Sequence, residues 1–240
     1  MEGAAPGGDG PRPSAASAPG FFVTGTGTEV GKSVVAAVLA RTLARQGRRV
    51  AVFKPAVTGL DDLSPAAPEP DHELLRRAAE SGQSDAEIAP YRYGPPASPH
   101  LAAALAGEEI EPRRLLDAAA AAGASADVLV CEGVGGLLVP LTRSYQVRDL
   151  AADLHLPLVI ASQPGLGTIN HTLLTVEAAR AAGLEVAFVV LTPWPRQPSA
   201  IEESNRETIA SLAQVTVETL PPLDLRDPGS WPALLPPPAH

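Results

Sequence analysis

The chain has 240 residues, of which 45% are hydrophobic, and its 27 acidic and 18 basic side chains give a formal net charge of -9. This length suits one α/β domain, or at most two small ones, with enough apolar residues to fill a core. The acidic balance argues against a general affinity for nucleic acid or an anionic membrane surface, because neither polyanion would be attracted by the mean field. No apolar run approaches the roughly 20 residues that cross a bilayer, and no secretory signal pattern opens the chain. We therefore expect a cytoplasmic globular protein that binds neither nucleic acid nor membrane.

Cysteine and lysine are both scarce. Cys131 is the only cysteine, which excludes an intramolecular disulfide and cysteine-based zinc ligation. Lys32 and Lys54 are the only lysines among the 18 basic residues. Because a compact ammonium and a planar guanidinium are not interchangeable, a lysine kept in an arginine-rich chain indicates a position that needs an ammonium.

In chain order, residues 1–19 consist mainly of Ala, Gly, Pro and Ser and predict a disordered tail, followed by a single domain over 20–240. Short apolar runs, typical of strands buried on both faces, cover 21–24, 50–54, 128–131, 158–161 and 186–191. Helical patterns lie between and after them, at about 32–46, 72–80, 112–122, 168–182 and 201–213. This alternation predicts a doubly wound α/β fold, with a mainly parallel sheet and helices on both faces.

A glycine-rich loop follows the first predicted strand. Its sequence is Gly25-Thr-Gly-Thr-Glu-Val-Gly31-Lys32-Ser33, and it opens a helix, as a P-loop does. Backbone N–H groups and the helix N-terminus would bind phosphate, Lys32 would reach the β- and γ-phosphates, and the Ser33 hydroxyl would bind Mg²⁺. The gap between the glycines is one residue longer than usual, since Thr26 stands where the common pattern has glycine. A purely structural glycine turn would not require Lys-Ser, so we predict phosphate binding on a P-loop NTPase-like fold.

Two other predicted strands end in charged residues. Lys54 closes the second strand, and Glu132 closes the third, just before a run of glycines. Parallel strands all finish at one edge of the sheet, so both side chains should approach Ser33. Two ammonium groups and a divalent cation would neutralise a triphosphate and the charge that develops during its transfer. The alternatives are a surface or helix-capping glutamate and a snorkelling lysine.

Several P-loop classes are excluded by residues that the chain lacks. A GTPase switch would need an Asn-Lys-x-Asp element, and a partitioning or ion-pump ATPase would need a lysine ahead of Lys32. A glutamine-dependent amidoligase would need a cysteine glutaminase site and a further domain, whereas Cys131 lies within a predicted strand. A nucleotide-dependent switch or assembly ATPase stays open as an alternative to an enzyme.

Three segments in this order, 22–33, Lys54-Pro-Ala-Val-Thr-Gly59 and Glu132-Gly-Val-Gly-Gly136, resemble the dethiobiotin synthetase family. Ser98-Pro-His100 and the segment Leu-Gly-Thr-Ile-Asn-His at 166–171 agree as well, so the resemblance runs from about 20 to about 223. It implies a homodimeric cyclo-ligase of biotin biosynthesis, which uses ATP and Mg²⁺ to convert 7,8-diaminononanoate and CO₂ to dethiobiotin, ADP and phosphate.

The resemblance also implies roles for individual residues. Lys32 would stabilise the transferring phosphoryl group, and Lys54 would balance the carbamate and the phosphate as a second catalytic residue. The metal ligands would be Ser33, Asp71 and Glu132, and the substrate would contact Thr58, Leu166, Gly167, Thr168, Ile169 and Asn170. Nucleotide contacts would come from Thr28, Glu29, Val30, Gly31, Lys32, Ser33, Val34, Asp71, Glu132, Gly133, Val134, Gly135, Thr192, Pro193, Pro221, Pro222 and Leu223.

The chain departs from the family pattern at the nucleotide base. Many members have an asparagine that reads adenine, where this chain has Thr192-Pro193-Trp194. The resemblance therefore implies phosphate binding more firmly than a preference for ATP. His100 and His171 are expected to be structural hydrogen-bond donors rather than bases, and an exposed helix N-cap is the alternative for Asp71.

Overall fold

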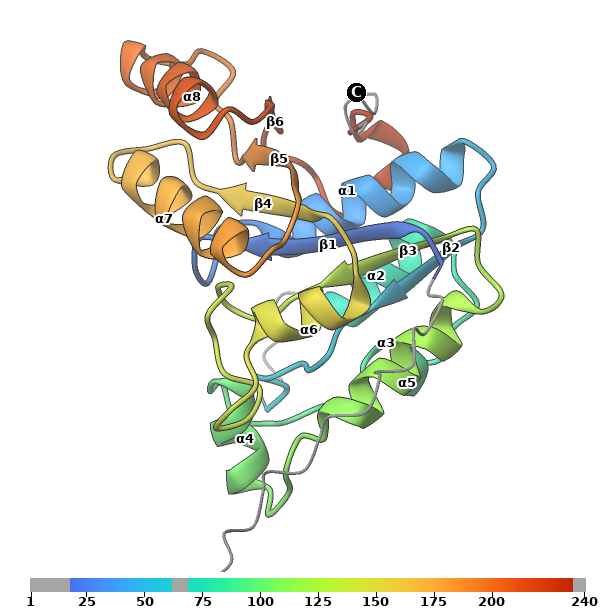
Figure 1. Ribbon diagram of the computed structural model, residues 1–240. Coiled ribbons are helices and arrows are strands. Elements are labelled where there is room, and N and C mark those ends of the chain that lie inside the picture. The colour runs from blue at the N-terminus through green and yellow to red at the C-terminus, as the bar shows by residue number, and fades with distance from the viewer. Residues whose placement is uncertain (1–17, 62–68, 235–240) are drawn as a thin grey trace, which may run out of the picture.

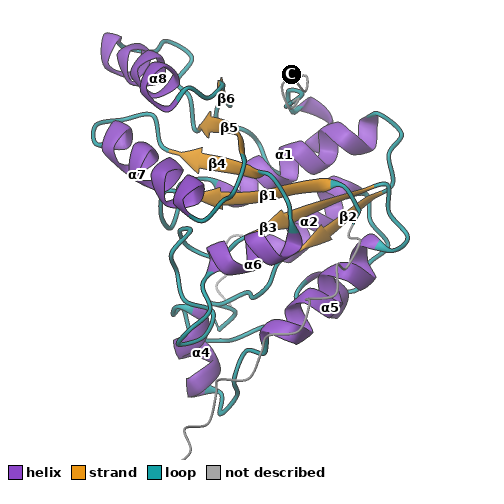
Figure 2. Cartoon of the chain, viewed as in Figure 1, coloured by secondary structure: helices purple, strands orange, loops and turns teal. Residues whose placement is uncertain are grey.

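Six parallel strands form the centre of the computed structural model, which describes residues 18–61 and 69–234 (Figure 1). The strands are β1 (Gly20–Gly25), β2 (Val50–Phe53), β3 (Val128–Glu132), β4 (Leu158–Ser162), β5 (Val186–Leu191) and β6 (Val217–Thr219). They lie in the order β2-β3-β1-β4-β5-β6, and every neighbouring pair is parallel. The arrowheads of β1, β4 and β5 point the same way in Figure 2. The chain moves from β1 to one side of the sheet and later to the other, which makes the carboxyl end of β1 a topological switch point. The predicted parallel α/β fold is confirmed.

Five helices match predicted ones: α1 (Lys32–Arg45), α2 (Asp71–Ala79), α5 (Pro112–Gly123), α7 (Thr168–Ala181) and α8 (Ala200–Ala213). The sequence pattern missed α3 (Asp85–Ile88), α4 (Pro99–Leu105), α6 (Val147–Leu154), the short 3₁₀ turn Pro228–Ser230 and strand β6. Most of these elements are too short to show a period. The exception is α6, whose buried residues Val147, Leu150, Ala151 and Leu154 have helical spacing.

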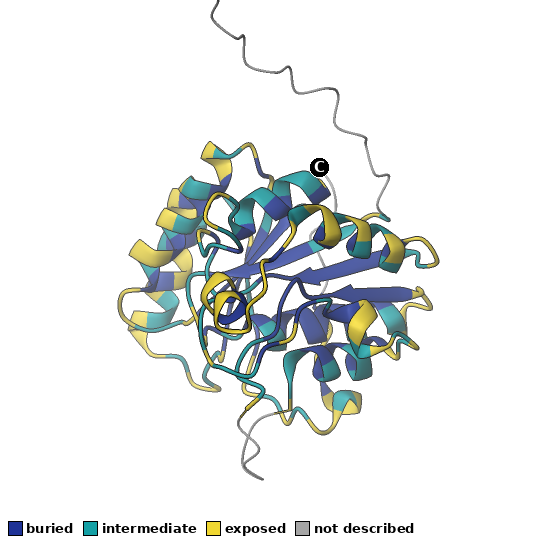
Figure 3. Cartoon of the chain, turned by 90° about the horizontal axis from the view of Figure 1, so that it is seen from below, coloured by how far each residue is buried: buried dark blue, intermediate teal, exposed yellow. Residues whose placement is uncertain are grey.

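Helices cover both faces of the sheet. In Figure 1, α6 and α7 lie in front of the strands, and α1 and α2 lie behind them. Successive strand residues alternate between the two cores, with Phe22 facing the α6 side and Val23 the α1 side. Figure 3 shows the strands buried between helices whose outer faces are exposed. Cys131 is fully buried in the α6-side core, as its place in a strand predicts.

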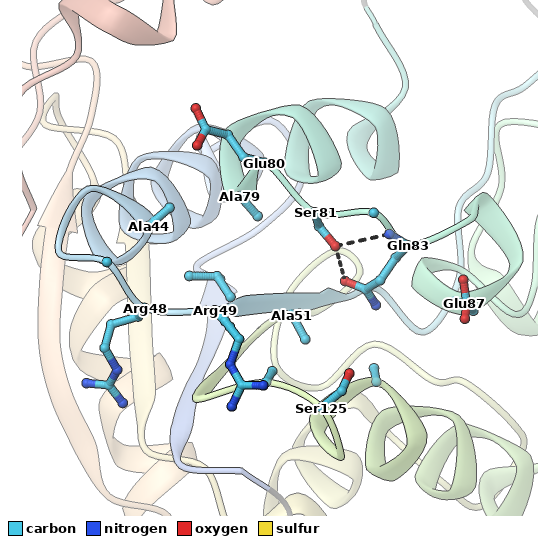
Figure 4. Close-up of a pocket in the computed structure, with 15 residues that line it drawn as sticks. Ala44, Arg48, Arg49, Ala51, Ala79, Glu80, Ser81, Gln83, Glu87 and Ser125 are labelled. Atoms are coloured by element: carbon cyan, nitrogen blue, oxygen red, sulfur yellow. Dashed lines mark hydrogen bonds between the residues drawn. The ribbon is translucent and has the colours of Figure 1, made fainter.

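Strand β2 lies at the edge of the sheet, where a side chain takes the place of a neighbouring strand. The Gln83 amide donates to the Val52 carbonyl at 3.0 Å, and its oxygen accepts from the Val52 N–H at 2.9 Å. Figure 4 shows Gln83 and Ser81 beside β2 in a cavity of about 580 Å³ that Arg48 and Arg49 also line. This cavity lies near the start of β2, at the end of the sheet opposite to the P-loop, and Gln83 covers a strand edge that could otherwise pair with another chain.

The segment after β6 returns across α1. Trp231 and Leu234 are buried there, the Arg45 guanidinium donates to the Trp231 carbonyl at 2.9 Å, and the Leu234 N–H donates to the Thr42 hydroxyl at 3.0 Å. Most of the predicted tail, residues 1–17, lies outside the described residues. Among the described residues, no helix is both long and apolar enough to span a bilayer.

Candidate active site

The predicted P-loop connects β1 to α1. Gly31 stands just before α1 with a φ of 90°, in the left-handed region that favours glycine. A β-carbon there would also lie 2.5 Å from Cγ2 of Thr192, so the loop after β5 packs directly on the P-loop. The Lys32 side chain folds back over the loop, where its ammonium donates to the Gly27 carbonyl at 2.7 Å. The loop therefore has the glycine, helix start and ammonium that phosphate binding requires.

Four predicted residues form one cluster beside this loop. The Lys54 ammonium lies 2.7 Å from Oε1 of Glu132 and 2.8 Å from Oδ2 of Asp71. The Ser33 hydroxyl lies 2.7 Å from Oδ1 of Asp71 and 2.9 Å from Oε1 of Glu132. These residues come from α1, the end of β2, the start of α2 and the end of β3, which the parallel sheet brings to one edge. The strand pattern predicted that Lys54 and Glu132 would approach Ser33, and Asp71 was predicted from the family resemblance. In the structure, Oε1 of Glu132 contacts both Ser33 and Lys54, and the two carboxylate oxygens of Asp71 contact one each.

Burial and charge act against each other in this cluster. Burial alone would lower the pKa of Lys54, but the carboxylates of Glu132 and Asp71 outweigh it and raise that pKa. Burial dominates at Glu132 and raises the pKa of its carboxyl group, despite the neighbouring ammonium. Burial would also raise the pKa of Asp71, but the Lys54 ammonium lowers it. Burial lowers the pKa of Lys32, and Glu132 only partly opposes that effect.

The donor atoms of the cluster fit a hard cation. Glu132 is fully buried, and its Oε2 has no hydrogen-bond partner among the described residues. Two carboxylates and a hydroxyl supply oxygen ligands, the type that Mg²⁺ takes, with water and phosphate completing the shell. Within the described ranges, no group of three or more His, Cys, Asp or Glu side chains is placed to hold a metal, so two carboxylates are the acidic ligands that this cluster offers. Asp71 begins α2 but makes no side-chain cap there, so the helix-cap alternative is not observed.

A cavity of about 970 Å³ opens next to Asp71. Six of the residues that were predicted to bind nucleotide, metal or substrate line this cavity: Thr28, Glu29, Thr58, Asp71, Val134 and Gly135. The rest of its wall is largely apolar, with Pro96, Pro99 and Val139 among the lining residues. The cavity therefore joins one side of the P-loop to Thr58, one of the predicted substrate contacts.

The other predicted nucleotide residues occupy varied surroundings. Val30 is buried, Val34 is half-buried, and Gly133 is buried against Phe22 and Val147. Thr192 is buried, whereas Pro193, Pro221 and Pro222 are exposed and Leu223 is half-buried. The backbone N–H of Trp194 donates to the Leu220 carbonyl at 2.6 Å, so the loops after β5 and β6 lie side by side. Contact with the P-loop is observed for Thr192.

The predicted substrate segment 166–170 stands apart from the large cavity, whose lining includes none of its residues. Leu166, two residues before α7, is 96% exposed, whereas Thr168, the first residue of α7, is buried. His171 lies one turn further along α7 and lines a second cavity of about 500 Å³, together with Gly27 and Leu138. His100 is exposed and is not among the residues that line these two cavities.

A buried group of hydroxyls, absent from the sequence prediction, links the P-loop to α7. The Ser162 hydroxyl lies 3.1 Å from that of Thr26, 2.9 Å from that of Thr168 and 3.0 Å from that of Thr172. Asn205 of α8 donates to the Pro164 and Gly165 carbonyls and holds the loop before α7. The sequence feature that could have revealed this group is a strand that ends in Ser162 and is followed by Thr168 and Thr172, four residues apart.

These features define the class of the protein as a P-loop NTPase-like α/β protein. The glycine loop and the first turn of α1 lie at the switch point of the sheet, beside two buried ammonium groups and an oxygen-rich cluster. In agreement, a family model described as an AAA domain matches residues 19–225. The GDP complex of the 54 kDa signal recognition particle protein of Aeropyrum pernix K1 aligns with a TM-score of 0.47 and 15% identity, covering 88% of this chain and 42% of that one. At that level of likeness the match says nothing about function.

Closer relatives specify the family. The ATP-dependent dethiobiotin synthetase BioD of Bacillus subtilis (strain 168) is 36% identical over 198 residues, which cover 82% of this chain and 84% of the relative. The same-named protein of Anaeromyxobacter dehalogenans (strain 2CP-1 / ATCC BAA-258) is 45% identical, covering 80% of this chain and 85% of the relative. The same-named protein of Rhodococcus erythropolis (strain PR4 / NBRC 100887) is 41% identical, covering 84% of this chain and 87% of the relative. The chain belongs to the ATP-dependent dethiobiotin synthetase family.

Proposed function

We propose that the chain is an ATP- and Mg²⁺-dependent cyclo-ligase that converts 7,8-diaminononanoate and CO₂ to dethiobiotin, releasing ADP and phosphate. One observation carries the proposal beyond family membership. Lys54, Asp71, Glu132 and Ser33 converge between the P-loop and a cavity that Thr58 lines. That convergence supports the proposal, because the reaction needs a phosphate-binding loop, oxygen ligands for a cation and room for a small substrate in one place.

The reaction requires activation of a poor leaving group. One amine of the substrate takes up CO₂ as a carbamate, and a carbamate oxygen then attacks the γ-phosphate. The neighbouring amine attacks the resulting mixed anhydride at carbon, the five-membered urea closes, and phosphate leaves. The site supplies proximity for this closure, and the proline and valine side chains of the cavity wall limit hydrolysis of the anhydride.

Each charged residue has a distinct task in this proposal. Lys32, held at the P-loop by the Gly27 carbonyl, stabilises the phosphoryl group in transfer. Lys54 balances the carbamate and the phosphate. Ser33, Asp71 and Glu132 hold Mg²⁺, which when bound screens the charge of the triphosphate. Thr58, half-buried in the cavity wall, hydrogen-bonds the amine or carbamate end of the substrate.

The substrate carboxylate would be bound by segment 166–170 of a second subunit. Apolar side chains support a subunit interface here, since Leu138, Leu166 and Leu174 are 50%, 96% and 55% exposed. Leu138 and Leu174 line one cavity together. Exposed leucines grouped in this way are typical of a surface that a partner covers. We therefore propose a homodimer that brings the start of α7 to the substrate of the neighbouring subunit.

The decisive experiment supplies 7,8-diaminononanoate, bicarbonate, Mg²⁺ and each nucleoside triphosphate in turn, and follows dethiobiotin and phosphate. We expect a cyclic urea with at least one nucleotide, and Lys54→Gln is expected to abolish it while the fold is retained. Hydrolysis that is indifferent to the diamine, with no urea formed, would instead support the switch or assembly ATPase. The series also determines the preferred base, because Thr192 and Pro193 stand where many family members have asparagine.

A further inference from the structure

Lys54 lies between the two carboxylates that we assign to Mg²⁺. Its ammonium bridges Oε1 of Glu132 at 2.7 Å and Oδ2 of Asp71 at 2.8 Å. Lys54 is only 3% exposed and Glu132 is fully buried, so the contact between them is shielded from solvent, whereas the Asp71 side chain is 40% exposed at the cavity. The two acids are therefore already held together by a cation, the ammonium group of a lysine of the same chain.

Direct contacts satisfy the two acids of this cluster only partly. Two carboxylates face one lysine ammonium, while the hydroxyl of Ser33 lies within bonding distance of both acids with a single hydrogen to donate. Oε2 of Glu132 remains without a hydrogen-bond partner among the described residues. Lys32 directs its ammonium to the Gly27 carbonyl instead. The cluster thus has more acceptor oxygens than its donors satisfy.

A divalent cation and the Lys54 ammonium cannot share these oxygens without cost. One divalent ion would neutralise the two carboxylates by itself, whereas the ion and the ammonium together would leave excess positive charge in a buried space. Like charges a few ångströms apart repel strongly in such surroundings. Binding of the ion should therefore release Lys54 from Asp71 and Glu132.

We propose that Lys54 is a resident counter-ion of the metal site and that Mg²⁺ binding exchanges with it, freeing its ammonium for the anions of the reaction. The proposal rests on the proposed function in assigning Asp71 and Glu132 to Mg²⁺. It adds an order of events, because Lys54 becomes available to a carbamate only after the ion has arrived. It also gives Lys54 a positioning role, since its ammonium keeps the two carboxylates together until then.

The first experiment measures Mn²⁺ binding, by the electron paramagnetic resonance of free Mn²⁺, to the nucleotide-free protein. Native chain is compared with Lys54→Gln, in which the ion no longer competes with an ammonium. We expect Lys54→Gln to bind Mn²⁺ about tenfold or more tightly than the native chain. Arg49→Gln is the matched control, because it also lowers the net charge by one unit but removes an exposed partner of Asp127. It should bind Mn²⁺ as the native chain does.

The second experiment needs no substitution of Lys54. The chain has two lysines, so carbon-13 at the lysine ε-position yields two side-chain signals, which Lys32→Arg assigns. We expect a non-hydrolysable ATP analogue alone to shift the Lys32 signal. Adding Mg²⁺ should then shift the Lys54 signal as its ammonium leaves the carboxylates.

The outcomes separate this inference from the proposed reaction. Native affinity for Mn²⁺ equal to that of Lys54→Gln, or a Lys54 signal that stays fixed while Mg²⁺ binds, would overturn the exchange. If neither protein binds Mn²⁺, with or without nucleotide, the metal assignment is wrong and the exchange falls with it. A chain that shows the exchange but forms no dethiobiotin would retain the inference and lose only the reaction.

Discussion

Lys54 and Glu132 are 78 residues apart in the chain, yet the ammonium of one lies 2.7 Å from a carboxylate oxygen of the other. The register of the sheet explains this contact. Phe53 of β2 pairs with Cys131 of β3, so the next residue of each strand lies at the same level. Both side chains are buried, and a charged pair in that setting is sensitive to the loss of either member.

Replacing the carboxylate of Glu132 should separate metal binding from folding. In Glu132→Gln, Lys54 keeps Asp71 as its partner, and the amide oxygen can still accept from Ser33. We expect a folded protein whose apparent Mg²⁺ affinity falls at least about tenfold, since even groups that only orient metal ligands usually contribute that much. Product formation measured against Mg²⁺ concentration tests this. An unchanged Mg²⁺ dependence would remove Glu132 from the ligand set.

Gly31→Ala should be costly for two independent reasons. Its φ of 90° disfavours any side chain, and the new methyl group would lie 2.5 Å from Cγ2 of Thr192. We expect a loss of about 1–3 kcal/mol in the free energy of unfolding, together with loss of nucleotide binding. Urea unfolding and a nucleotide titration measure the two effects.

Gly27→Ala is the control for that change, because the nearest atom its methyl group would meet is 3.9 Å away and its φ lies outside the left-handed region. Its unfolding free energy should match that of the native chain. Adding Thr192→Ser to Gly31→Ala removes the colliding methyl group and should restore part of the stability. No recovery in the double variant would mean that backbone strain alone sets the cost.

Ser162 joins the P-loop to the start of α7 through one hydroxyl. Ser162→Ala removes a hydrogen-bond partner from the half-buried hydroxyl of Thr26 and from the buried hydroxyls of Thr168 and Thr172, so we expect about 1–3 kcal/mol of destabilisation. If segment 166–170 binds substrate, KM for the diamine should also rise more than kcat falls. Thr175→Val is the control, because it removes a hydroxyl of the same helix that donates to the His171 carbonyl. Equal changes in both variants would exclude a special role for Ser162.

His72 should make the stability of the protein depend on pH. Burial lowers the pKa of His72 below its ordinary 6.5, although Asp85 and Glu73 oppose this effect and Arg92 and Arg76 add to it. The unfolded chain therefore takes up the proton first, and the stability due to neutral His72 is lost as pH falls below 6.5.

The test of this prediction compares urea unfolding of the native chain and His72→Gln at about pH 7.5 and about pH 5. The native chain should lose more stability between the two conditions than the variant does. His155→Asn is the control, because His155 is exposed in a left-handed conformation that asparagine tolerates. A pH dependence that is the same in the native chain and His72→Gln would contradict the prediction.

Local patterns were sufficient for much of the fold. Apolar runs bounded by helical periods located five strands and five helices, because strands buried on both faces and amphipathic helices leave continuous signals. They failed at α3, α4 and β6, which have four, seven and three residues and show no period. Segment 166–170 was predicted from family resemblance, and nothing in its local sequence indicates which surface it faces.

The sequence by itself indicated the P-loop, the two lysines and the glutamate at a strand end, because the carboxyl ends of parallel strands lie together at one end of the sheet. Asp71, at the start of a helix, was predicted only from the family resemblance. Only the tertiary structure decided how those residues meet. Lys54 bridges Asp71 and Glu132, Thr192 packs on Gly31, and Ser162 joins two loops. Such contacts depend on strand register and helix placement to within about an ångström, which long-range packing sets and no local pattern encodes.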